Sequence, residues 1–119
     1  MAKISPHFSE SEVMCKCGCG YIAVNPILVR LLEKIRDNCG NNPVMVHSWC
    51  RCPTHNENVG GVSESQHLYG AAADISISGV NVQALGDIAI TCGADGIGYY
   101  YTQGFVHVDV RGGRDTWVG

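Results

Sequence analysis

Two histidines and one aspartate stand out in the 119-residue sequence because their types and spacing suit a metal site. His67 and Asp74 are separated by six residues in SQHLYGAAADIS (65–76), and His107 lies in FVHVDVR (105–111). Two imidazoles and one carboxylate form a common open zinc site, in which the fourth position is left to water. Such a metal polarises a carbonyl group and lowers the pKa of its water to about 7, which suffices for amide hydrolysis.

The alternation of polar and apolar residues predicts that these side chains point the same way. Successive side chains of a strand lie on opposite faces. In the segment 105–111 the valines would therefore share the buried face. The polar face would carry Phe105, His107, Asp109 and Arg111. In the segment 74–78 the two isoleucines would be buried and Asp74 would be polar. If the two strands are neighbours in one sheet, Asp74 and His107 converge, and His67 lies just before one of the strands.

The elements that must position these residues can be predicted from apolar periodicity and from start and stop signals. Three helices are expected, over 26–40, 53–58 and 82–92. Three strands are expected, over 43–48, 74–78 and 105–111. Residues 1–12 have the composition of a polar lead-in. The order predicts a small α+β domain over residues 1–119, with an antiparallel sheet and helices on one face.

Charge and hydropathy exclude several classes of partner. The net charge is −3 and no basic run occurs, so neither nucleic acid nor an anionic membrane is an expected partner. No apolar run approaches the roughly 18 residues of a membrane span. The first residues contain no apolar segment, so we expect no secretory signal in this chain and synthesis in the cytoplasm. We expect a monomer.

Seven cysteines are many for this length, and their state is open. Three lie in CKCGCG (15–20), two lie in WCRC (49–52), and Cys39 and Cys92 stand alone. Lack of a leader favours a reducing compartment, in which thiols stay free or bind metal. Disulfides, free thiols and a second metal site formed by CKCGCG with Cys52 are the alternatives. The one-residue gaps in CKCGCG are tighter than the usual spacing of zinc-binding cysteines.

Two long segments carry a resemblance to a known family. SWCRCPTHNENVGGVSESQHLYGAAADIS (48–76) and GIGYYYTQGFVHVDVRG (96–112) resemble the zinc D-Ala-D-Ala carboxypeptidase family, in its branch of small murein peptidases from bacteria and phages. The specific pattern is S-x-H-x6-D followed by H-x-D on a strand. The resemblance covers about residues 7–117 and implies the fold shared with hedgehog signalling domains and vancomycin-resistance dipeptidases.

This resemblance implies roles for particular residues. The three zinc ligands of the family fall on His67, Asp74 and His107. The family's arginine falls on Arg51, where a guanidinium group would hold a carboxylate or carbonyl of the substrate.

Two departures from the family pattern concern the catalytic acid and the pocket wall. Several relatives carry an acidic general base three positions before the last ligand, and Gly104 occupies that position here. Asp109 is expected to replace it as base or proton shuttle, or else to orient a ligand imidazole. Trp49 and Cys50 stand where relatives tend to have Gly-Tyr, and they are expected to reshape the pocket wall beside Arg51.

The predicted function is that of a zinc metallopeptidase acting on the bacterial cell wall, encoded by a bacterium or a phage. The substrate would be a peptidoglycan stem peptide or cross-link, cleaved as by a D-Ala-D-Ala carboxypeptidase. Three alternatives remain open. They are an L-Ala-D-Glu endopeptidase of the endolysin type, a non-catalytic zinc-bearing binding module, and a small cysteine-rich metal or redox protein.

Overall fold

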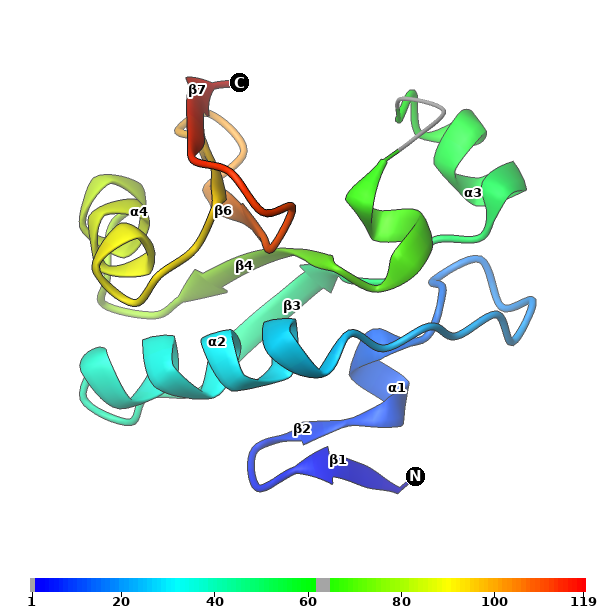
Figure 1. The fold of residues 1–119 in the computed structure, drawn as a ribbon, viewed down its shortest axis with the longest axis horizontal. Helices are drawn as coiled ribbons and strands as arrows, with labels where there is room; N and C mark the ends of the chain where they lie inside the picture. Colours follow the sequence, from blue (N-terminus) through cyan, green and yellow to red (C-terminus); the bar gives the residue numbers. More distant parts are fainter. Residues whose placement is uncertain (1, 62–64) are drawn as a thin grey trace.

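A five-stranded sheet forms the centre of the computed structural model, which describes residues 2–61 and 65–119 (Figure 1). In spatial order the strands are β3 (Val44–Ser48), β4 (Ala72–Ile77), β6 (Phe105–Asp109), β5 (Gly96–Tyr100) and β7 (Asp115–Val118). Neighbouring strands are antiparallel, except that β5 and β7 are parallel. The predicted class, α+β with a mainly antiparallel sheet, is confirmed.

Two amphipathic helices cover the apolar face of the sheet. They are α2 (Pro26–Asn38) and α4 (Val82–Thr91). Each begins at an asparagine cap: Asn25 accepts a hydrogen bond from the backbone N–H of Ile27, and Asn81 accepts one from Ala84. Their apolar stripes bury against the valines and isoleucines of the strands. This packing fixes the sheet and leaves its other face for polar side chains.

One row of residues crosses the polar face through all five strands. The strand register aligns Ser48, Asp74, His107, Gly98 and Trp117. Since neighbouring strands lie about 4.8 Å apart, side chains in one row can meet above the sheet. The predicted convergence of the two strand-borne polar residues follows directly from this register.

The first residues form structure, which corrects the prediction of a polar lead-in. They make a hairpin of β1 (Lys3–Ser5) and β2 (Phe8–Ser9), followed by the short helix α1 (Glu10–Val13). Phe8 is 1% exposed and packs edge-on against Trp49, with ring centroids 5.9 Å apart. The segment contributes to the core because this aromatic contact and the buried Val13 outweigh its polar composition.

Two short elements stand beside the polar face near the start of β4 (Figure 1). These are helix α3 (Pro53–Asn58) and the 3-10 turn η1 (Gln66–Tyr69). The predicted helices and strands all occur, with ends shifted by a few residues, but β5 and β7 were not predicted. No helix within the described residues is long and apolar enough to cross a membrane.

Candidate metal centre

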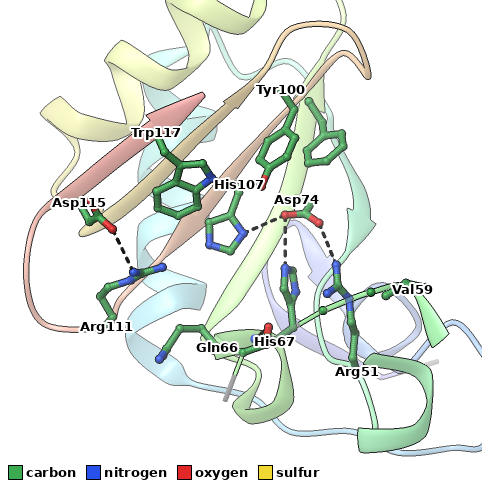
Figure 2. A pocket seen from close by; sticks show the side chains of 14 residues that line it. Arg51, Val59, Gln66, His67, Asp74, Tyr100, His107, Arg111, Asp115 and Trp117 are labelled. Carbon is green, nitrogen blue, oxygen red and sulfur yellow. Dashed lines mark hydrogen bonds and ion pairs between the residues drawn. The ribbon is translucent and has the colours of Figure 1, made fainter. Parts of the chain in front are cut away.

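The structure brings together the three predicted ligands at the centre of the polar face (Figure 2). His67 comes from η1, Asp74 from β4 and His107 from β6. Ligand atoms of the three side chains all lie within 4.8 Å of one another. Asp74 Oδ1 is 3.3 Å from His67 Nε2 and 3.1 Å from His107 Nδ1. Three donor atoms therefore converge on one point, as a mononuclear metal site requires.

Each imidazole makes a hydrogen bond through the nitrogen that lies away from Asp74. This bond fixes which nitrogen faces the point where the three donor atoms converge. His67 Nδ1 lies 2.6 Å from the carbonyl oxygen of Trp49, which can only accept, so Nδ1 donates and Nε2 presents its lone pair. His107 Nε2 lies 2.8 Å from the Asp109 carboxylate, so Nε2 donates and Nδ1 presents its lone pair. Partners of this kind orient metal-ligating histidines in proteins.

Asp109 lies behind His107 and is completely buried. Its carboxylate accepts hydrogen bonds from the backbone N–H of Gly96 at 3.0 Å and from the guanidinium of Arg111 at 2.6 Å. Burial opposes ionisation of Asp109, but the hydrogen bonds from His107 and Arg111 prevail and hold its pKa well below the usual range. Of the two roles expected for Asp109, this geometry favours orienting the imidazole, because the residue does not line the cavity.

The charges of the ligand residues support one another. Burial raises the pKa of Asp74, but the adjacent imidazoles of His107 and His67 outweigh this effect and hold the pKa well below its usual range, so the carboxyl is ionised. Burial lowers the pKa of His107, but its bonds to Asp109 and Asp74 prevail and raise it. Asp74 thus presents an ionised carboxylate at the point where the two imidazoles meet, as a cation held there would require.

Arg51 reaches the same site from the segment before α3. Its Nη2 lies 3.3 Å from Asp74 Oδ2, its Nη1 lies 3.2 Å from Asn56 Oδ1, and its Nε lies 3.2 Å from Ser48 Oγ. Gly61 leaves room for the Asn56 amide, since a Cβ there would lie 2.1 Å from Asn56 Oδ1. The guanidinium is therefore fixed at the edge of the centre before any substrate arrives.

A cavity of about 660 Å³ opens above the three predicted ligands. Tyr100, Phe105 and Trp117 form its aromatic wall, with Phe105 stacked on Tyr100. Figure 2 shows Tyr100 and Trp117 on the side of the ligand residues opposite Arg51. The cavity is large enough for several residues of a peptide. Asp74 and Asp115 are its acidic lining residues within the described part of the chain.

Several of these lining residues were missed by the sequence interpretation. Asp115 and Trp117 belong to β7, and their alternation with Thr116 and Val118 was the signal that could have revealed the strand. Arg111 lies on the polar face as predicted, but its contacts with the Asp115 carboxylate, at 3.5 Å, and with the ring of Trp117 depend on that strand.

Gly104 and Trp49 do not take part in the cavity. Gly104 closes the exposed turn before β6 and has a positive φ of 80°. The prediction that Trp49 and Cys50 reshape the pocket wall is wrong, because both side chains are fully buried in the core, where Trp49 donates to the carbonyl of Gly70 at 2.9 Å. The contribution of Trp49 to the site is its backbone carbonyl, which orients His67.

An α+β fold that gathers two oriented histidines and an aspartate beneath a peptide-sized cavity defines a candidate metallohydrolase centre. The chain belongs to the peptidase M15 family, whose sequence profile matches residues 6–109. It is also 36% identical over 83 residues to the zinc D-Ala-D-Ala carboxypeptidase of Streptomyces albus G. That alignment covers 69% of this chain and 32% of the relative, so the chain spans about a third of the relative's length. The predicted family is confirmed.

Proposed function

We propose that this chain is a zinc metallopeptidase that hydrolyses peptidoglycan stem peptides. The observation that carries the proposal is the convergence of His67, Asp74 and His107, with the tautomers of both imidazoles set by buried partners. Two neutral imidazoles and one carboxylate are a donor set that zinc accepts readily, so the residues fit this metal. When bound, zinc supplies Lewis-acid polarisation of a carbonyl oxygen and activation of a water molecule.

The chain's own residues would hold the substrate on the side of Arg51. Three of the five guanidinium N–H donors are engaged by Ser48, Asn56 and Asp74. Among the described residues, two donors therefore remain for a carboxylate of the substrate, and a planar guanidinium suits that shape. The wall formed by Tyr100, Phe105 and Trp117 would exclude water from the opposite side of the peptide.

The proposed bond is the terminal one of a stem peptide that ends in D-Ala-D-Ala. The name of the Streptomyces relative supports this substrate class, as does a fixed arginine beside the centre for the terminal carboxylate. We assign to Asp109 the orientation of His107 rather than proton transfer, because its carboxylate faces Gly96 and Arg111 and not the cavity.

The proposal is tested by measuring zinc content and murein hydrolysis on the same samples of wild type, His67→Ala and His107→Ala. We expect the wild type to release murein fragments, and each variant to lose both the zinc held by the three ligands and the hydrolysis. Variant His47→Ala is the matched control, because His47 is an exposed residue that bonds Ser76 outside the cavity. Hydrolysis by either ligand variant would contradict the proposal, and zinc binding without any hydrolysis by wild type would favour a binding module.

The bond is tested with two synthetic stem peptides that differ only at the C-terminus, one free acid and one amide. A carboxypeptidase that uses Arg51 should prefer the free acid, and Arg51→Ala should remove most of that preference. Release of a fragment cut between L-Ala and D-Glu, with equal rates on acid and amide, would instead assign the endopeptidase activity.

A further inference from the structure

Four thiol groups gather at a second place in the described part of the chain, separate from the candidate metal centre. The sulfur atoms of Cys15, Cys17, Cys19 and Cys52 all lie within 4.8 Å of one another. Cys17 Sγ is 3.4 Å from Cys15 Sγ and 3.7 Å from Cys52 Sγ, and all four are free thiols. In Figure 1 the loop that carries the first three lies beside the start of α3, where Cys52 is the N-cap.

We propose that these four thiols, called here the thiol cluster, bind one structural zinc ion through four sulfur ligands. With Zn–S bonds of about 2.3 Å, the sulfurs of a tetrahedral site lie about 3.8 Å apart, close to the separations seen here. A closed set of four sulfur ligands is typical of a structural site, whereas a catalytic site keeps one position open. The peptidase centre, with two nitrogen ligands and one oxygen ligand, is of the second kind.

Backbone hydrogen bonds already support the sulfurs as ligands. The N–H of Cys52 donates to Cys15 Sγ at 3.3 Å, that of His55 donates to Cys52 Sγ at 3.3 Å, and that of Tyr21 donates to Cys19 Sγ at 3.4 Å. These N–H donors would stabilise the negative charge that four thiolates bring to a metal. The tight C-x-C-x-C spacing is accommodated because the chain turns back, with the N–H of Cys15 bonded to the carbonyl of Tyr21 at 2.9 Å.

The three cysteines outside the thiol cluster lie in different surroundings. Cys50 is completely buried, and its sulfur accepts a hydrogen bond from the N–H of Ala23 at 3.2 Å. Cys39 and Cys92 lie at the C-terminal ends of α2 and α4 and belong to the apolar core. Cys17 and Cys19 are instead exposed, so a metal can enter from solvent.

The thiol cluster would connect the N-terminal segment to the peptidase centre. Arg51 directly precedes Cys52, and its backbone N–H donates to the carbonyl of His67 at 3.0 Å. The N–H of Cys50 donates to the carbonyl of Val13 at 2.9 Å. A metal at the cluster would therefore hold the loop 15–19 against the segment that carries Arg51 and contacts a predicted ligand.

The test measures metal per chain on full-length protein purified under reducing, oxygen-free conditions, and then the absorption spectrum after replacement by Co²⁺. We expect wild type to bind two zinc ions, and its cobalt form to show intense thiolate-to-metal charge-transfer absorption. Cys19→Ala should lose one metal and most of that absorption, whereas Cys92→Ala, a buried cysteine outside the cluster, should lose neither. Circular dichroism verifies that both variants are folded.

The two proposals are distinguished by the variant His67→Ala, which should keep the thiolate–cobalt absorption while losing the other metal. The test of the thiol cluster therefore does not depend on whether the protein hydrolyses murein. The cluster proposal is overturned if wild-type cobalt protein shows no thiolate charge transfer, or if Cys19→Ala and Cys17→Ala keep it. It is also overturned if mass spectrometry finds cluster cysteines paired as disulfides in the freshly isolated protein, or if the bound metal is iron.

Discussion

At the scale of single residues, the orientation of His107 depends on one buried carboxylate. Asp109 accepts from His107 Nε2 and is itself held by Gly96 and Arg111. The sequence showed that Asp109 and His107 share a strand face, because alternation alone decides that. It did not distinguish a base from an orienting partner, because that depends on which side of the imidazole the carboxylate occupies.

Replacement of Asp109 by Asn separates these two roles. The amide keeps the shape but loses the charge that strengthens the bond from His107, so zinc affinity should fall about 10- to 100-fold. Competition with a chromophoric chelator measures this change, and Asp37→Asn, an exposed aspartate on α2, is the control. A variant with unchanged zinc affinity and greatly reduced hydrolysis would restore the assignment of Asp109 as general base.

Gly96 leaves the space that the Asp109 carboxylate occupies. A Cβ at this position would lie 2.2 Å from Asp109 Oδ2 and 2.5 Å from its Cγ. Gly96→Ala should therefore destabilise the protein by about 1–3 kcal/mol through overpacking, and weaken zinc binding as well. Urea denaturation measures the first effect, with Gly113→Ala as control because a Cβ there meets nothing within 4 Å. Equal stability of the two variants would show that Asp109 can shift without cost.

At the scale of elements, the turn η1 positions His67 and ends at a glycine that a side chain cannot replace. Gly70 has a φ of 65°, and a Cβ on it would lie 1.8 Å from the carbonyl oxygen of Ala23. Gly79 has a similar positive φ of 84° but open space around it. Alanine at either position would pay about 1–2 kcal/mol for the left-handed backbone conformation. Only at Gly70 would its Cβ also clash with the backbone of Ala23.

We expect Gly70→Ala to be the more destabilising of this matched pair, by at least about 1 kcal/mol, because backbone atoms cannot move aside as a side chain can. Thermal or urea unfolding of both variants measures the difference. The same displacement should weaken zinc binding through His67 in Gly70→Ala only. If both variants lose the same stability, the contact with the loop around Ala23 does not constrain η1.

Elements with strong local signals were predictable, and elements defined by distant contacts were not. The helices α2 and α4 carry asparagine caps and apolar stripes, and β4 and β6 alternate, so the sequence alone located these elements and predicted that Asp74 and His107 converge. Strand β5 is glycine-rich because Gly96 and Gly98 lie beneath Asp109 and Trp117, and glycines weaken a strand pattern. Strand β7 was missed because its alternation spans only four residues, and its parallel pairing with β5 leaves no further signal in the local sequence.

At the scale of the whole molecule, the N-terminal hairpin is fixed to α2 by one carboxylate. Glu33 Oε2 accepts from the Ser5 hydroxyl at 2.6 Å and from the backbone N–H of His7 at 3.0 Å, and Oε1 lies 2.6 Å from His7 Nδ1. The spacing of Ser9 and Glu12 matched a capping box, the signal that could have revealed α1, and the N–H of Ser9 does donate to Glu12 at 2.9 Å. Contacts made by Glu33 across 26 residues or more leave no such signal.

These contacts predict a pH-dependent contribution of Glu33 to stability. Partial burial raises the pKa of Glu33, but the bonds from Ser5 and His7 outweigh it and lower the pKa below its ordinary value. A group whose pKa is depressed in the folded state stabilises the protein above its ordinary pKa, about 4.3, and loses this contribution as the pH falls through the folded value. At pH 7 Glu33→Gln should therefore lower the free energy of unfolding by about 1–2 kcal/mol.

The difference between wild type and Glu33→Gln should shrink as the pH is lowered from 7 through the acidic range, because protonated Glu33 and Gln are alike in charge. Urea denaturation at a series of pH values measures it. Glu57→Gln, at an exposed position on α3, controls for the general effect of removing one negative charge. A difference that stays constant with pH would mean that shape, and not the carboxylate charge, holds the hairpin to α2. A difference that vanishes at every pH would mean that the aromatic contact of Phe8 with Trp49 suffices to hold this segment to the rest of the chain.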